Sequence, residues 1–153
     1  MYNGRKTKID DEYTTPKYAW ENIKQFIPIN SIIWEPFYCD GKSGLYLEEL
    51  GFKVVHKNED FFDNDYGDIV ISNPPFSLSK QILERLVKLN KPFILLMTTS
   101  KLNSQYLQRL LKDHLQLIIP EKRIKFNKEN KNPTFDCLYY CWKMNLVKDL
   151  TFL

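Results

Sequence analysis

Short runs of β-branched and aromatic residues alternate along the chain with segments in which apolar residues recur at helical spacing. The short runs predict strands at residues 31–35, 53–56, 68–72, 92–97 and 115–119. The helical spacing predicts helices at residues 16–26, 45–50, 78–89 and 106–111. This alternation is typical of a parallel sheet with crossover helices, so the sequence predicts an α/β fold.

Residues with special backbone preferences mark the ends of these elements. Thr15 is predicted to cap the first helix with Pro16 at its first helical position, and Gly51 is predicted to end the second helix. An aromatic-rich run at 135–144 follows a turn-prone stretch at 127–133, which predicts a hairpin partner that returns antiparallel. We therefore expect a three-layer α/β sandwich around a mostly parallel sheet with an antiparallel C-terminal strand.

A chain of 153 residues has room for one domain, but not for a catalytic domain plus a separate recognition domain. We expect a single domain over residues 1–153, with residues 1–10 as a flexible lead. No run of about 18 apolar residues and no signal peptide is present, which predicts a soluble, intracellular protein without a membrane partner.

The three cysteines, Cys39, Cys137 and Cys141, form no CxxC pair. We therefore expect free thiols, and neither a disulfide nor a metal site. Cys137 and Cys141 are four residues apart on a predicted strand, so their side chains share a face and are expected in the core.

The most informative residues follow the ends of two predicted strands. In an open α/β sheet, ligands bind beyond the carboxyl ends of the strands, where the strand order reverses. The first predicted strand is followed by residues 35–44, which contain two acids and two glycines, and the third is followed by Asn73-Pro74-Pro75-Phe76. These two segments are the first candidates for a binding site.

The order strand, Asn73-Pro74-Pro75-Phe76, helix resembles the catalytic motif of the amino-methylating branch of the Rossmann-like S-adenosylmethionine-dependent methyltransferases. Three other segments are similar to that family in order and spacing: residues 11–16 to its Tyr-Thr-Pro segment, residues 35–41 to its acidic, glycine-containing first motif, and residues 59–62 to its acid-aromatic segment. The resemblance covers nearly the whole chain. It implies the Rossmann-like methyltransferase fold and methylation of the exocyclic N6 amine of adenine in a nucleic acid.

The resemblance also implies how the cofactor S-adenosylmethionine is bound. In the family, the Tyr-Thr-Pro segment cradles the methionine end of the cofactor and the acid-aromatic segment contacts its adenine. Glu35 and Asp40 would then pair with the ammonium group, Asp60 would accept a hydrogen bond from the adenine, and Phe61 or Phe62 would pack on its ring. The implied cofactor-binding residues are Tyr13, Thr14, Pro16, Glu35, Pro36, Phe37, Asp40, Gly41, Asp60, Phe61 and Asn73.

The implied catalytic residues are Asn73, Pro74, Pro75 and Phe76, and the chemistry explains why these residue types are needed. The exocyclic nitrogen of adenine is a poor nucleophile because its lone pair is delocalised into the ring, so a catalyst should accept hydrogen bonds from its two N–H groups. The Asn73 side-chain oxygen and the Pro74 carbonyl are the expected acceptors. Pro75 adds stiffness without a donor, and Phe76 offers a flat face to the base.

Two positions depart from the family pattern. Cys39 stands where the family commonly has a loop glycine, and it fits there if its backbone φ is negative. His56 stands where the family often has an acid that binds the ribose, a role that would then fall to Glu59. Without the resemblance, His56 is expected to be structural or solvent-exposed, and Gly41 and Gly44 are explained equally well as ordinary loop glycines.

The charge distribution along the chain is uneven. Residues 101–131 carry eight basic and three acidic side chains, an excess of +5 in a chain whose net charge is +3. In this stretch, Lys122, Arg123 and Lys125 are interleaved with apolar residues after a predicted strand. The pattern indicates either a contact with nucleic-acid phosphates or an edge strand protected by charge.

The preferred interpretation is methylation of adenine in DNA. Because the target base must leave a duplex and the chain has few elements that could read sequence, we expect single-stranded substrates, a homodimer or a recognition subunit as partner. Three alternatives remain open: adenine in RNA, a glutamine side-chain amide of a protein, or a catalytically silent binding subunit with the same fold.

Overall fold

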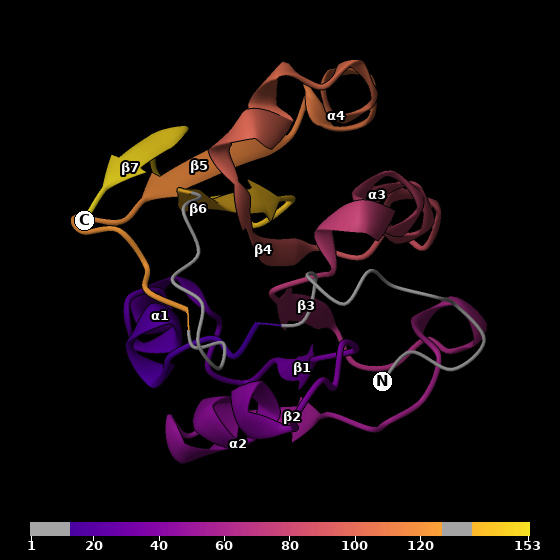
Figure 1. Cartoon of the computed structure of the whole chain (residues 1–153), viewed down its shortest axis with the longest axis vertical. Coiled ribbons are helices and arrows are strands. Elements are labelled where there is room, and N and C mark those ends of the chain that lie inside the picture. The colour runs from indigo at the N-terminus through magenta and orange to yellow at the C-terminus, as the bar shows by residue number, and fades with distance from the viewer. Residues whose placement is uncertain (1–12, 127–135) are drawn as a thin grey trace.

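A mixed β-sheet forms the central layer of the molecule. A computed structural model describes residues 13–126 and 136–153 (Figure 1), so the expectations for residues 1–10 and for the turn at 127–133 lie outside the described residues. The described strands form one seven-stranded sheet in the order β2-β1-β3-β4-β6-β5-β7. These strands are β1 (Ile32–Trp34), β2 (Lys53–Val55), β3 (Ile69–Ser72), β4 (Phe93–Thr98), β5 (Leu115–Ile119), β6 (Cys137–Trp142) and β7 (Leu150–Phe152).

Helices cover both faces of this sheet. The α-helices are α1 (Lys17–Glu21), α2 (Lys42–Glu49), α3 (Ser79–Lys88) and α4 (Gln105–Leu111). Short 3₁₀ helices occupy the connections at η2 (Lys24–Phe26), η3 (Phe61–Asp63), η4 (Phe76–Leu78) and η5 (Thr99–Asn103). In Figure 1, α1 and α2 lie on one side of the sheet and α3 and α4 on the other.

Two clusters of buried side chains join these layers. The first contains Trp20 of α1 and Leu47 of α2, and the second contains Leu83 of α3. Strand β4 contributes to both, with Ile94 in the first cluster and Leu95 in the second, because successive strand residues point to opposite faces. The predicted three-layer, Rossmann-like α/β sandwich is thus confirmed.

The antiparallel strand is β6, which lies between β4 and β5 and pairs antiparallel with both. The antiparallel return after β5 is therefore confirmed, whereas insertion beside β4 was not predicted. Cys137, Tyr139 and Cys141 point into the first cluster, as expected for the two cysteines. Burial raises the pKa of each of these two thiols to about 12, so both remain protonated at neutral pH.

The last strand, β7, pairs parallel with β5 and was not predicted. Unlike the equally short β1 and β2, β7 (Leu150-Thr151-Phe152) contains no two consecutive apolar residues that would mark a strand. A single side chain of β5 supports the approach to β7: Gln116 Nε2 donates to the carbonyl oxygens of Leu146 at 2.9 Å and Lys148 at 3.2 Å, and its Oε1 accepts from the Leu146 N–H at 2.7 Å.

The starts and ends of two helices differ from the prediction. The single helix predicted at 16–26 is α1 followed by η2, and Pro16 rather than Thr15 occupies the N-cap position, without a side-chain cap. Helix α2 begins at Lys42 instead of 45, because Gly41 adopts a left-handed φ of 77° and turns the chain directly into the helix.

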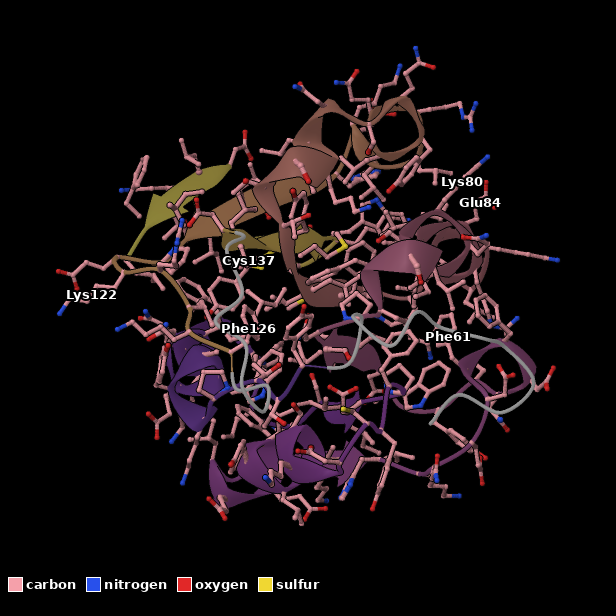
Figure 2. The ribbon with its side chains drawn as sticks, in the orientation of Figure 1. Phe61, Lys80, Glu84, Lys122, Phe126 and Cys137 are labelled. Carbon is pink, nitrogen blue, oxygen red and sulfur yellow. The ribbon has the colours of Figure 1, made fainter. Side chains whose placement is uncertain are left out.

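Residues 120–126 form no strand, so the edge-strand explanation of the basic segment is wrong. Ile124 and Phe126 are buried in the first cluster, and the backbone N–H of Lys125 donates to the Tyr18 hydroxyl at 2.8 Å. Side-chain burial, not sheet pairing, therefore fixes this segment. Figure 2 shows Phe126 close to α1 and Lys122 at the rim of the molecule.

The strand order reverses at β1. The chain leaves β1 for β2 on one side and then crosses to β3 on the other side of β1, and all three strands are parallel. In such sheets a crevice forms beyond the carboxyl ends of the two strands at the reversal. Glu35 directly follows β1 and Asn73 directly follows β3, so both lie beyond the carboxyl ends of the strands at the reversal. We call the region between these two strand ends the crevice.

Candidate active site

Glu35 links the two strands that border the crevice. It is 2% exposed, and its Oε1 accepts hydrogen bonds from the Ser72 hydroxyl at 2.6 Å and from the Phe37 N–H at 2.9 Å. Burial raises the pKa of this carboxyl to about 8, although both hydrogen bonds act in the opposite direction. Glu35 is therefore mostly neutral at pH 7. Because both bonds end on Oε1, Oε2 is the oxygen that remains for a proton or a ligand.

Asn73 has one end of its amide occupied and the other end unpaired. Its Nδ2 donates to the Thr15 hydroxyl oxygen at 3.0 Å. Its Oδ1 is buried and has no hydrogen-bond partner among the described residues. A buried carbonyl oxygen without a donor costs free energy, and such atoms in native structures call for an explanation. An acceptor kept for a donor from outside the protein is one such explanation.

Residues 13–16 connect Asn73 with the loop after β1. Thr14 donates its hydroxyl hydrogen to Asp40 Oδ2 at 2.9 Å, next to the Thr15 contact with Asn73. Asp40 is exposed, and its Oδ1 accepts from the Lys42 N–H at 3.0 Å. Tyr13 packs edge-on against Phe126, with ring centroids 6.3 Å apart. The segment thus brings together the first loop, Asn73 and the end of the basic segment.

The loop after β1 depends on left-handed backbone and on close contacts. Cys39 has a φ of 48°, so the negative angle on which its fit was conditional is not observed. A Cβ on Gly41 would lie 2.8 Å from the Tyr38 hydroxyl oxygen, and one on Gly44 would lie 2.3 Å from Cγ of His56. Gly41 is therefore required by its left-handed φ of 77°, and Gly44 by the His56 side chain, so neither is an ordinary loop residue.

His56 has a structural role, as the sequence without the resemblance suggested. Its Nε2 lies 3.0 Å from Glu48 Oε1 of α2, and its ring stacks on Tyr38 with centroids 6.1 Å apart. Its Nδ1 has no partner among the described residues and would lie 2.6 Å from a Cβ on Gly44, so it faces the helix. These contacts hold α2 against the end of β2.

The segment after β2 is only partly accessible. Asp60, 9% exposed, uses Oδ1 to accept from the Phe62 N–H at 2.8 Å and so caps η3. Phe61 is 1% exposed and packs against Trp34 and Phe37, with ring centroids 5.3 and 5.0 Å away. Its ring belongs to the second cluster of buried side chains, so the half-buried Phe62 is the better placed of the two phenylalanines to cover a ligand.

Arg85 of α3 binds the backbone of the segment that follows β2. Its Nε donates to the Phe61 carbonyl at 3.1 Å and one terminal nitrogen donates to the Asn64 carbonyl at 2.8 Å. The guanidinium also lies 5.7 Å from the centroid of the Phe61 ring. Arg85 was not predicted, because a long-range contact between an arginine and backbone carbonyls leaves no local pattern in the sequence.

The turn between Asn73 and η4 contains Pro74 and Pro75, and η4 begins at Phe76. Both prolines are buried, and Pro75 is the N-cap of η4 with extended backbone. Phe76 is half-buried, and its carbonyl oxygen accepts from the Ser79 hydroxyl at 2.7 Å and from Lys101 Nζ at 3.4 Å. Lys101 follows β4, so inspection of every strand end could have found it.

The basic residues predicted to contact nucleic acid are all exposed, but they differ in charge environment. Arg123 forms an ion pair with Asp136. Among the described residues, neither Lys122 nor Lys125 has an acidic partner. Two of the three positive charges thus have no counter-charge within residues 13–126 and 136–153.

Three hollows in the surface lie away from this crevice. One of about 390 Å³ is lined by His114, Gln116 and Lys143, at the amino end of β5. The other two meet at Gln25, near η2. We regard the crevice as the better candidate, because the polar side chain of Gln116 already supports β7, whereas Asn73 Oδ1 bonds to none of the described residues.

No group of His, Cys, Asp and Glu side chains in residues 13–126 and 136–153 is arranged to hold a metal ion. None of the helices in the described part of the chain has the length and apolar character needed to cross a bilayer. Neither protein-family models nor curated proteins match the chain in sequence, so its function has to be inferred from the geometry of the crevice.

Cys39 provides a test of the loop geometry. A side chain at φ 48° is strained, so Cys39→Gly should be more stable to unfolding than Cys39→Ala by about 1 kcal/mol. Urea unfolding of the two variants isolates the backbone effect, since both lack the thiol. Equal stability of the glycine and alanine variants would show that the left-handed conformation is not populated.

Glu35 provides a test of the buried carboxyl. With a pKa of about 8 in the folded state against 4.5 unfolded, the folded protein holds a proton that the unfolded chain has released. Its contribution to stability is therefore complete below pH 4.5 and is lost as the pH rises to about 8, with a slope of at most about 1.4 kcal/mol per pH unit. Urea titrations across this range should show a shallower decline for Glu35→Gln than for wild type.

The matched control is Glu21→Gln, the same change at an exposed glutamate. It should retain the wild-type slope. A Glu35→Gln variant with an unchanged slope would mean that the Glu35 carboxyl is ionised in the folded protein.

Proposed function

We propose that this chain transfers the methyl group of S-adenosylmethionine to the exocyclic N6 amine of adenine in a nucleic acid, with DNA as the first candidate. The observation that supports the proposal most directly is the buried Oδ1 of Asn73 at the carboxyl end of β3, which has no hydrogen-bond partner among the described residues. The resemblance of Asn73-Pro74-Pro75-Phe76 to the amino-methyltransferase motif supports the same chemistry.

The acceptor side of the crevice suits an amine that must be made more nucleophilic. Asn73 Oδ1 and the Pro74 carbonyl are two hydrogen-bond acceptors from consecutive residues, and an amino group has two N–H donors to give. Accepting both favours the pyramidal nitrogen whose lone pair can attack. Proline has no N–H, so Pro74 and Pro75 introduce no competing donor. The half-buried ring of Phe76 offers a surface for the base to stack on.

The cofactor side fits the methionine end better than the ribose. When bound, S-adenosylmethionine supplies an electrophilic methyl group on a sulfonium sulfur. Asp40 is an exposed carboxylate oriented by Thr14, and Glu35 Oε2 adds a second oxygen nearby in the chain. On the ribose side, His56 is occupied by Glu48, and Glu59 accepts from the Tyr66 hydroxyl at 2.7 Å. Asp60 Oδ2 remains as an acceptor for the adenine amine.

A nucleic-acid substrate is favoured over a protein amide by the position of the basic segment. Phe126 contacts Tyr13, two residues before the threonine that holds Asn73. Lys125 directly precedes Phe126, so its charge lies close to the segment that binds Asn73, and it has no acidic partner among the described residues. Lys122 lies farther out, at the rim of the molecule (Figure 2). Lysines without acidic partners are well suited to phosphate contacts, which dominate the affinity for nucleic acids.

The function is tested by methyl transfer with Asn73→Ala. Radiolabelled S-adenosylmethionine is supplied with matched DNA and RNA pools, and the product nucleosides are identified. Removal of the acceptor should reduce transfer at least about 100-fold while cofactor binding is largely retained. Asn30→Ala, the same change at an exposed residue before the amino end of β1, should leave transfer intact.

Labelled N6-methyladenine from the RNA pool alone would select RNA as the substrate. Labelling of a protein glutamine instead would contradict the nucleic-acid proposal. Undiminished transfer by Asn73→Ala would contradict the assigned role of its oxygen, and absence of cofactor binding in wild type would favour a silent binding subunit.

Lys122 and Lys125 provide a separate test of the nucleic-acid surface. Replacing both by alanine should weaken binding of a single-stranded oligonucleotide several-fold and reduce the slope of log affinity against log salt by about 1 to 2. Fluorescence anisotropy at several salt concentrations measures both quantities. The control replaces two exposed lysines outside this segment, Lys53 at the start of β2 and Lys88 at the end of α3. Equal effects of the two pairs would mean that the charge acts without a defined surface.

A further inference from the structure

Two neighbouring threonines contact opposite sides of the crevice. Thr14 donates to Asp40 in the loop after β1, and Thr15 accepts from Asn73 after β3, at 2.9 and 3.0 Å. These partners are 26 and 58 residues away in sequence. Because adjacent residues contact both loops, the segment that carries them must cross the crevice from one loop to the other.

The Thr15 hydroxyl has no role in starting the helix. Pro16 is the N-cap of α1 and has no side-chain cap, and the Ala19 N–H donates to the Pro16 carbonyl at 3.0 Å. Thr15 is nevertheless 2% exposed. A hydroxyl is costly to bury unless it is hydrogen-bonded, and the partner that Thr15 has is the Asn73 amide.

We propose that Thr15 is a positioning residue for Asn73, which holds the amide group so that its Oδ1 is left to accept a hydrogen bond from the amine to be methylated. The inference rests on the function proposed above for Asn73. It assigns to Thr15 a role in binding the amine that is methylated, whereas the resemblance implied that its neighbours Thr14 and Pro16 bind the cofactor.

The physical reason lies in the freedom of an asparagine side chain. The last torsion of asparagine is broad and roughly two-fold, so an untethered amide samples many orientations and both ends. A hydrogen bond from Nδ2 to Thr15 restricts the plane of the amide. Because Thr15 accepts from Nδ2, Oδ1 is the end of the amide that is left for the N–H groups of the incoming amine. Without the Thr15 hydroxyl, the Asn73 amide would have to be oriented anew in each turnover, at a cost in entropy.

The test compares Thr15→Val, which removes the hydroxyl at nearly constant shape, with Thr15→Ser, which keeps it. Thr15→Val is expected to lower kcat about 10- to 100-fold with little change in the Kd of S-adenosylmethionine, and Thr15→Ser to restore most of kcat. Thr151→Val, the same change on β7 at the edge of the sheet, is the matched control and should behave as wild type. Thr14→Val should instead weaken cofactor binding, through Asp40.

A second measurement is independent of turnover. In ¹⁵N-labelled protein without cofactor, the Nδ2 hydrogens of Asn73 should exchange slowly in wild type and Thr15→Ser, and faster in Thr15→Val. This reports the hydrogen bond itself and remains informative if the valine variant is less stable, provided that its thermal unfolding midpoint lies above the temperature of the measurement.

A loss of kcat and of amide protection in Thr15→Val, both restored by serine, would support the inference. Full kcat in Thr15→Val, a parallel loss of kcat and cofactor affinity, or equally fast exchange in wild type would overturn it. These outcomes differ from failure of the proposed function itself, in which wild type transfers no methyl group to any pool, and which would remove the positioning role as well.

Discussion

The hydrogen bond between Ser72 and Glu35 is the contact on which the rest of the crevice depends. It joins the carboxyl ends of β3 and β1, the two strands that diverge where the order of the sheet reverses. Strands at such a reversal are held by backbone pairing only up to their last residues, and the loops beyond them separate. A buried side-chain contact at that point keeps the two loops in register, so Asn73 leaves β3 in a fixed relation to the loop after β1.

The contrast between two amide side chains shows which polar groups serve the fold and which are held for a ligand. Gln116 uses both ends of its amide to support the approach to β7. Within the described part of the chain, Asn73 uses only its nitrogen, although its oxygen is buried as well. Folding alone selects for the first arrangement, because every buried polar atom is satisfied. The second arrangement is stable only because the surrounding structure tolerates its cost, which is a common property of binding sites.

Patterns local in sequence predicted the layers of the fold, and contacts distant in sequence explain most of what was missed. The continuous apolar runs of β3 and β4 and the apolar face of α3 show their periods over enough residues to be recognised. The three residues of β7 do not. The position of Asn73 after a strand was predictable, but its tie to Thr15 was not, since Thr15 before a proline is explained equally well as a helix cap. The left-handed φ of Cys39 was also hidden, because cysteine carries no preference for that conformation.

Glu35 and Asp40, the two acids after β1, lie in different environments. The sequence assigned both of them to the ammonium group of the cofactor, but their environments suit them to different roles. Glu35 is buried, and ionising it would place a charge where water cannot stabilise it. Asp40 is exposed and is oriented by the Thr14 hydroxyl and by the Lys42 N–H. A cationic ammonium group is therefore met at less cost by Asp40, whose charge already exists in solution. Glu35 contributes most in its neutral form, as the side chain that links β1 to β3 through Ser72. Ionising the buried carboxyl would lower the stability of the folded protein.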